Sequence, residues 1–480
     1  MTQNDRLTLQ HIIERVDAKA QSFCALSDRI WHMPELAFEE HRSCAEHVAA
    51  LAAEGFRITR KVGGIETAFM AEYGEGGPVL AFLGEYDALP DLSQAKGIEK
   101  AEPLQRGGPG HGCGHNLLGA GAALAAVALK DALAAAGIEG RVRYYGCPAE
   151  ESGSGKSFMA RAGVFDDVDV AFCWHPNVVN EVVAASSLAF IQCYFRFAGR
   201  ASHAAASPHL GRSALDAVEL MNIAVNYMRE HMPAEARIHY AVTNSGGIAP
   251  NVVQANAEVL YLVRSPDIAE TKRLFERVRK AAEGAALMTE TQASYQVTDA
   301  GLNLVPNETL LEAMHDNMVR IGAPAFNGDD RDFADRLRRA SLSDEDIAAS
   351  VASHDPALAA HSLHEGILPM ARHASVQMGS TDVGDVSWIA PTVQCHTACF
   401  AIGTPFHSWQ LVTQGLEPAA HKGMVAAAKA LASTAADCLS KPDLIARAKA
   451  ELKRRTGGRP FESPIPPEIL PEHLHSSQGR

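Results

Sequence analysis

Three apolar segments, each predicted to be a strand, end in side chains that can bind a metal or move a proton. The segments cover residues 78–83, 141–146 and 168–174 and are followed by Asp87, by Glu150-Glu151 and by His175. An Ala- and Leu-rich stretch at 117–136, between the first two strands, predicts a buried helix. Parallel strands meet at their carboxyl ends, where open α/β sheets bind ligands. This order therefore predicts an α/β domain with a mixed, mostly parallel sheet covered by helices, and a site at that edge.

A second, smaller domain is predicted to be inserted in the first. Strands are expected at 188–197, 237–243, 251–264 and 292–297, and helices at 213–229 and 268–287. This β-α-β-β-α-β order is typical of a ferredoxin-like α+β sheet. We therefore expect a catalytic domain in two parts, 1–186 and 304–480, around an inserted domain at 187–303. Residues 325–375 are unusually polar and charged, and form an elaboration to which we assign no chemistry.

Composition narrows the class of partner. The chain has 480 residues, 47% of them hydrophobic, and a net charge of −14, which argues against nucleic acid or an anionic membrane surface. Residues 1–17 contain no apolar signal segment, and Lys130 and Asp131 interrupt the longest apolar stretch. The nine cysteines are odd in number and scattered, as free thiols are in a reducing compartment. We expect a cytoplasmic protein with a small-molecule substrate.

The segment 110–116 reads Gly-His-Gly-Cys-Gly-His-Asn and alternates three possible metal ligands with glycines. In an extended backbone His111, Cys113 and His115 would point to the same side, so that two or all three of them could converge on one point. The segment also precedes the helix at 117–136, whose N-terminus favours a thiolate. A plain glycine-rich turn is the alternative. A Cys113 nucleophile with His115 as its base would lack the third group that orients the base in such sites.

The adjacent carboxylates Glu150 and Glu151 are costly to bury unless a cation or a hydrogen bond satisfies them. Metal-assisted hydrolysis would use one as a ligand and the other as a general base, whereas a solvated loop pair is the alternative. The following Ser-Gly-Ser-Gly-Lys-Ser at 152–157 is similar to the end of a phosphate-binding loop, but Glu150 stands where that motif needs glycine. His175 and His407 are weak candidates for metal ligands when each is considered alone. A His, Cys and Glu set suits zinc, or manganese where oxygen ligands are more numerous.

These motifs, in this order, resemble the M20 metallopeptidase/amidohydrolase family, in particular its hippurate and indole-acetyl-amino-acid hydrolase branch. The resemblance rests on Tyr86-Asp87-Ala88-Leu89-Pro90, Gly112-Cys113-Gly114-His115-Asn116, Pro148-Ala149-Glu150-Glu151, Trp174-His175, Phe406-His407, Ser202-His203-Ala204-Ala205, Gly246-Gly247, Asn251-Val252-Val253 and Arg264. It covers nearly the whole chain, from the first predicted helix to the helix after His421.

The resemblance implies a site with two divalent metal ions per subunit, Mn²⁺ or Zn²⁺. The implied ligands are Cys113, His115, Glu151, His175 and His407. Glu150 is implied as the base that activates water, and Asp87 as a residue that supports the ligands. In the inserted domain, His203 is implied to stabilise the oxyanion in the partner subunit's site. Asn251 and Arg264 are implied to bind the substrate carboxylate.

The implied reaction is hydrolysis of the amide bond of an N-acyl amino acid, with p-aminobenzoyl-glutamate as the first candidate substrate. Other aryl- or indole-acyl amino acids, such as acyl-aspartates, and a non-catalytic subunit of a paired hydrolase are the alternatives. The inserted domain implies a homodimer, or a heterodimer with a paralogous subunit. Two residues depart from the branch: Asn116 and Glu85 stand where it usually has aspartate, and either change could alter the metal preference.

Overall fold

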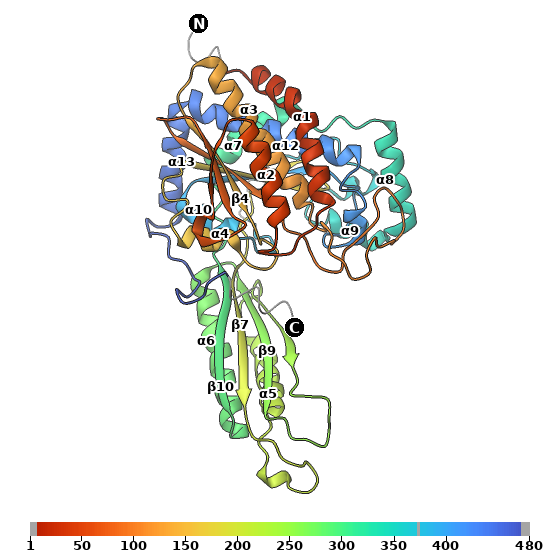
Figure 1. Cartoon of the computed structure of the whole chain (residues 1–480), viewed down its shortest axis with the longest axis vertical. Helices are drawn as coiled ribbons and strands as arrows, with labels where there is room; N and C mark the ends of the chain where they lie inside the picture. Colours follow the sequence, from red (N-terminus) through yellow and green to blue (C-terminus); the bar gives the residue numbers. More distant parts are fainter. Residues whose placement is uncertain (1–6, 372–374, 472–480) are drawn as a thin grey trace. The chain divides into compact units, whose positions relative to one another are not determined.

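The computed structural model describes residues 7–371 and 375–471, which form two compact units (Figure 1). The first unit comprises Met1–Ala184, Val305–Ala374 and Val386–Phe461, and the second comprises Ala185–Leu304, Ser375–Asp385 and Glu462–Arg480. Three parts of the predicted organisation lie outside the described residues: 1–6 of the predicted segment 1–186, 372–374 of the elaboration, and 472–480 of the predicted segment 304–480.

The first unit contains a seven-stranded sheet in the order β1-β2-β4-β3-β5-β11-β6. Its strands are β1 (Arg57–Arg60), β2 (Phe69–Tyr73), β3 (Val79–Glu85), β4 (Arg141–Cys147), β5 (Val170–Asn177), β6 (Glu181–Val182) and β11 (Thr392–Ala398). The four central strands β4, β3, β5 and β11 are parallel, and the outer strands pair antiparallel. The predicted mixed, mostly parallel sheet is confirmed.

Long helices cover this sheet. The helices of the first unit are α1 (Leu9–Trp31), α2 (His41–Ala53), α3 (His115–Ala136), α4 (Gly155–Arg161), α7 (Glu308–Ile321), α8 (Gly328–Ser341), α9 (Asp344–Ser350), α11 (Trp409–Val412), α12 (Pro418–Ser440) and α13 (Pro442–Arg455), while α10 (Val383–Ile389) has residues in both units. Short 3₁₀ helices lie at Val62–Gly64 and Pro356–Ala360. Helices α8 and α9 fall within the predicted elaboration.

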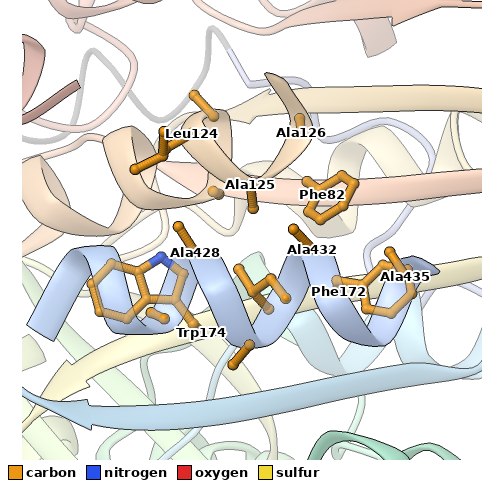
Figure 2. Packing of buried hydrophobic residues seen from close by; sticks show 14 of the residues in the cluster. Phe82, Leu124, Ala125, Ala126, Phe172, Trp174, Ala428, Ala432 and Ala435 are labelled. Carbon is orange, nitrogen blue, oxygen red and sulfur yellow. The ribbon is translucent and has the colours of Figure 1, made fainter. Parts of the chain in front are cut away.

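The centre of the first unit is packed with small side chains from α3 and α12. Figure 2 shows the two helices side by side, with aromatic rings from the neighbouring strands in the same cluster. The labelled members are Phe82, Leu124, Ala125, Ala126, Phe172, Trp174, Ala428, Ala432 and Ala435. Because alanine side chains are small, the two helices and the sheet can approach one another closely. This close packing holds the first turn of α3 near the ends of the strands.

Gly119 of α3 marks the closest approach of this helix to β3. A Cβ atom at this position would lie 2.5 Å from the backbone oxygen of Glu85 and 2.9 Å from Nε2 of His47. Because a backbone oxygen cannot move aside cheaply, we expect Gly119→Ala to lower the free energy of unfolding by about 1–3 kcal/mol. Urea unfolding of the metal-loaded protein measures this.

Gly328→Ala is the matched control, because Gly328 also lies in a helix of the first unit and no atom lies within 4 Å of its added Cβ. This variant should be neutral or slightly stabilising. Equal unfolding midpoints for the two variants would contradict the close packing of α3 on β3.

The second unit is a four-stranded antiparallel sheet in the order β10-β7-β9-β8, with two helices. Its elements are β7 (Ala189–Ala198), α5 (Ala214–Met228), β8 (Arg237–Asn244), β9 (Asn256–Ser265), α6 (Ile268–Thr289) and β10 (Gln292–Gly301), with 3₁₀ turns at Pro208–Leu210 and Arg229–His231. This chain order and strand order confirm the predicted ferredoxin-like arrangement. The strand predicted at 251–264 is shorter than expected, so Asn251 lies in the loop before β9.

Helix α3 is the one helix in the described ranges that is long and apolar enough to cross a membrane. Lys130 and Asp131 were predicted to interrupt this apolar stretch, but the helix continues through both residues to Ala136. However, 89% of its most apolar window is buried inside the protein. A core helix has this property as well. All nine cysteines lie in the described ranges and none forms a disulfide.

Candidate metal centre and active site

The glycine-rich segment 110–116 forms a turn rather than an extended strand. Gly114 has a left-handed backbone (φ 78°), and a Cβ atom there would lie 2.8 Å from the ring of Pro176. His115 is the first residue of α3. His111 is turned away, with Nε2 3.1 Å from the backbone oxygen of Ile30 in α1. The prediction that alternate side chains converge because the backbone is extended was therefore wrong for the backbone, although Cys113 and His115 do come together.

Two groups of potential ligands meet at Cys113. Its Sγ atom forms one group with His115 and His175, and another with Glu151 and His407. Within each group, one donor atom from every residue lies within 4.8 Å of the others. The two groups share only Cys113, and together they contain the five residues predicted as ligands. Two neighbouring cation positions are therefore compatible with this arrangement.

Hydrogen bonds orient two of the imidazoles. Nδ1 of His115 lies 2.9 Å from Oδ1 of Asp87, and Nδ1 of His175 lies 2.8 Å from the backbone oxygen of Pro176. Because these oxygens can only accept, each Nδ1 is the donor, and each Nε2 faces the cluster. Nε2 of His175 lies 3.3 Å from Sγ of Cys113. Metal-binding histidines are commonly held in this way by their other nitrogen.

The two adjacent carboxylates occupy different surroundings. The side chain of Glu151 is 7% exposed, and its Oε2 lies 3.3 Å from Nε2 of His407. The backbone N–H of Glu151 donates to Oδ2 of Asp87 at 2.8 Å. Glu150 is more open, with 15% of its side chain exposed, and its Oε2 lies 4.0 Å from Nε2 of His115. Glu151 is thus embedded among the potential ligands, whereas Glu150 lies beside them.

Backbone strain occurs at two positions of the site. Ala149, immediately before Glu150, and His407 both have a left-handed backbone, with φ of 60° and 57°. The N–H of His407 donates to the backbone oxygen of Gly112 at 2.9 Å, which ties it to the glycine-rich turn. Residues other than glycine adopt this conformation at a cost, and such strain is concentrated at functional sites.

Buried atoms without a partner test whether a cation fits. Nε2 of His115 and Oε1 of Glu151 are buried and have no hydrogen-bond partner among the described residues. Burial, together with the Glu151 carboxylate, raises the pKa of the Cys113 thiol well above its usual range. Burial also raises the pKa of Glu151. A divalent cation would satisfy both atoms and stabilise the ionised thiolate and carboxylate. The donor set of thiolate, imidazole and carboxylate therefore fits such an ion.

Asp87 contacts two residues of this cluster and affects the protonation of one of them. Burial opposes protonation of His115, but the Asp87 carboxylate outweighs burial and raises the pKa of the imidazole well above its usual range. A cation at Nε2 of His115 would therefore displace a proton. Asp87 thus contacts both His115 and the backbone of Glu151, and its supporting role stays a prediction.

Sequence reasoning missed Glu85 as a member of the cluster. Its carboxylate forms a third group with His115 and Glu150, again with donor atoms within 4.8 Å of one another. The residue was noted only as a departure from the branch pattern. Its position at the C-terminal end of β3 was the available signal, because the other strand ends also contribute to the site.

Asn116, the other departure, follows His115 directly but its side chain contacts other parts of the first unit. Its Nδ2 donates to Oγ of Ser27 at 3.0 Å and to the backbone oxygen of Gly415 at 3.3 Å. The amide nitrogen therefore connects α3 to α1 and to the segment before α12.

The three residues predicted to meet the substrate from the inserted domain lie in the second unit. Nδ1 of His203 accepts hydrogen bonds from the backbone N–H groups of Ala205 and Ala206 at 3.2 and 3.1 Å. The backbone oxygen of Asn251 accepts from Ala204 N–H at 3.0 Å, so these loops are adjacent. Arg264 is on β9, and its buried Nε has no hydrogen-bond partner among the described residues.

The sequence of this chain is similar to those of known proteins. The model of peptidase family M20/M25/M40 matches residues 81–304. The chain is 46% identical over 474 residues to the B subunit of the p-aminobenzoyl-glutamate hydrolase of Escherichia coli, an alignment that covers 96% of this chain and 98% of that protein. The chain belongs to the M20 peptidase family. It is therefore a metal-binding hydrolase of amide bonds.

Other relatives have different names within this family. The mouse Xaa-Arg dipeptidase is 32% identical over 455 residues, covering 92% of this chain and 91% of that protein. The A subunit of the Escherichia coli p-aminobenzoyl-glutamate hydrolase is 31% identical over 229 residues, covering 45% of this chain and 51% of that protein. A dinuclear metal-binding M20 peptidase from Bacillus subtilis has a similar fold, with a TM-score of 0.56, 18% identity and coverage of 88% of this chain and 99% of that one.

Proposed function

We propose that this M20 hydrolase cleaves the amide bond of p-aminobenzoyl-glutamate and releases p-aminobenzoate and glutamate. One observation carries the proposal: the five potential ligands form two groups that share Cys113, beside the carboxylate of Glu150. The similarity over nearly the whole length to one component of a hydrolase named for this substrate supports the choice of acyl group.

Cys113, His115, Glu151, His175 and His407 would hold two divalent cations, Mn²⁺ or Zn²⁺. When bound, the cations polarise the amide carbonyl and make water more acidic. The protein residues prepare this chemistry: Asp87 and the Pro176 carbonyl fix the two imidazoles, so that their Nε2 atoms face the cluster. Fixing the ligands before substrate arrives lowers the reorganisation needed during the reaction.

Glu150 is the proposed general base. Its carboxylate accepts a proton from the attacking water and then donates it to the nitrogen of the leaving amino acid. The greater exposure of Glu150 relative to Glu151 supports this division, because the base must reach both the water and the substrate. Glu151 keeps both oxygens among the potential ligands.

The substrate carboxylate is proposed to bind Arg264 and Asn251. His203 is proposed to donate a hydrogen bond to the oxyanion in the partner subunit's site, as the family resemblance implies. The unpartnered Nε of Arg264 supports this role, because a buried guanidinium nitrogen otherwise has an unmet hydrogen bond. Burial also lowers the pKa of Arg264, as expected when a charged group has no partner. A carboxylate from the substrate would supply one.

We expect Arg264→Ala to raise KM for p-aminobenzoyl-glutamate by about 10–100-fold, the cost of losing a charge-assisted hydrogen bond. Steady-state kinetics measure this. Arg196→Ala is the matched control, because Arg196 lies in the same sheet but binds Glu258 with Nε 2.6 Å from its Oε2. Equal KM values for the two variants would remove Arg264 from the proposed substrate site.

We further propose that the protein acts in the cytoplasm as a dimer. The partner is either a second copy or a paralogous protein, as the names of the two Escherichia coli relatives suggest. The second unit, with its ferredoxin-like sheet, is the proposed dimerisation surface.

A substrate panel tests the function. The full-length protein is stripped of metal with a chelator and reloaded with Mn²⁺ or Zn²⁺, alone or with a paralogous partner similar to the A subunit of the Escherichia coli enzyme. Amino acid release is then measured from p-aminobenzoyl-glutamate, aryl- and indole-acyl aspartates and a dipeptide ending in arginine. We expect the highest kcat/KM with p-aminobenzoyl-glutamate. Preference for another member would replace the substrate, and inactivity toward all of them would favour a non-catalytic role in a paired hydrolase.

A further inference from the structure

Lys156 lies in the segment that is similar to a phosphate-binding loop, yet it contacts a carboxylate. Its Nζ atom is 2.7 Å from Oε1 of Glu85 at the end of β3. The lysine side chain is completely buried, and that of Glu85 is 6% exposed. A buried lysine is costly unless an anion pairs with it, so this contact fixes Oε1 of Glu85 in place.

The other oxygen of Glu85 faces the metal centre. Its Oε2 atom lies 3.3 Å from Nε2 of His115. This nitrogen is buried and has no hydrogen-bond partner among the described residues. The carboxylates of Glu85 and Glu150 share the surroundings of this nitrogen, with donor atoms within 4.8 Å of one another. His115 belongs to one of the two groups that meet at Cys113, and the carboxylate of Glu85 also lies beside its Nε2 atom.

We propose that Glu85 is an additional carboxylate ligand of the metal centre and that Lys156 is its positioning residue. The ammonium group holds one oxygen of Glu85, which leaves the other directed at the cation beside His115. Glutamate is one methylene longer than the aspartate that usually stands at this position in the family branch, and so it reaches further. The inference rests on the proposed metal centre.

An added oxygen ligand has a chemical consequence. Manganese favours carboxylate oxygens, whereas zinc is well served by the thiolate and imidazoles already present. Glu85 would therefore raise the affinity of the centre for Mn²⁺ more than its affinity for Zn²⁺. The paired occurrence of Glu85 and Lys156 gives the site a metal preference that its other five ligands do not determine.

Metal titration of the metal-free, full-length protein tests the proposal. The dissociation constants of Mn²⁺ and Zn²⁺ are measured by calorimetry for the wild type, Glu85→Gln and Lys156→Met. Because both cations are divalent, removing a nearby charge should change the affinities for Mn²⁺ and Zn²⁺ by similar factors. A change in the ratio of the two dissociation constants therefore reports the loss of an oxygen ligand. We expect the ratio of the Mn²⁺ constant to the Zn²⁺ constant to rise about 10–100-fold in Glu85→Gln. It should rise in the same direction in Lys156→Met.

The matched control is Glu72→Gln. Glu72 lies on β2 of the same sheet, and its partly buried carboxylate pairs with Arg143 on β4. This variant should lose stability and keep the wild-type ratio. If Glu85→Gln keeps the wild-type ratio, Glu85 is not a ligand, and if only Lys156→Met keeps it, the lysine does not position the carboxylate. Should Glu85→Gln fail to fold, Glu85→Asp retains the charge and shortens the reach, so an unchanged ratio there also overturns the proposal.

Failure of this inference is separable from failure of the proposed function. A wild-type protein that binds neither cation would refute the metal centre itself. A wild type that binds two cations, with Glu85→Gln identical to it, would refute only the additional ligand.

Discussion

Replacing Glu150 with alanine is expected to lower kcat for p-aminobenzoyl-glutamate by about 10²–10⁴-fold, the usual contribution of a positioned general base. The carboxylate lies beside the potential ligands, with Oε2 4.0 Å from Nε2 of His115, but it belongs to neither of the two groups that meet at Cys113. Removing it should therefore stop proton transfer and leave the five potential ligands in place. Elemental analysis should find the wild-type metal content in the variant.

Glu66→Ala is a suitable control for this measurement. Its carboxylate is 58% exposed and pairs with Lys61 on the surface, so kcat and metal content should both stay at the wild-type values. A Glu150→Ala variant that retained full turnover would show that another group is the base.

Replacing Glu151 with alanine is expected to cause loss of the metal, in contrast to the wild-type metal content expected for Glu150→Ala. Its Oε1 is buried without a partner among the described residues, and its Oε2 lies 3.3 Å from Nε2 of His407. The variant removes a ligand rather than a supporting group, so metal affinity should fall by more than about 100-fold. Turnover should be lost with it.

Adding excess Mn²⁺ or Zn²⁺ distinguishes metal loss from loss of chemistry. Glu151→Ala should recover part of its turnover at high metal concentration, whereas Glu150→Ala should recover none. Metal contents reduced equally in both variants would contradict the assigned roles of the two carboxylates.

The sequence predicted those parts of the fold that have strong hydrophobic patterns. The central strands and α3 appear close to the expected residues because continuous apolar runs occur in buried strands and helices. The short outer strands β1 and β2 were missed. Their burial alternates irregularly, and two strands of four and five residues carry little periodic signal.

Side-chain directions in the turn at 110–116 could not be predicted. The turn depends on Gly114 in a left-handed conformation, which glycine permits but does not dictate. Consequently the glycine spacing left His111 open as a third converging side chain, whereas its Nε2 atom lies 3.1 Å from the backbone oxygen of Ile30.

The role of Glu85 was hidden for a different reason. Its partner Lys156 comes from another strand–helix connection, and the two meet only because β3 and β4 are neighbouring parallel strands. A single sequence contains no periodic pattern for such a contact. The functional roles of His203, Asn251 and Arg264, which rest on family resemblance, stay predictions.

The most direct test of the metal centre is an anomalous difference map from crystals grown with Mn²⁺, recorded at the manganese absorption edge. We predict two peaks per chain, each bordered by ligands among Cys113, His115, Glu151, His175 and His407, with Glu85 beside the one at His115. A single peak, or peaks remote from Cys113, would contradict a two-metal hydrolase site.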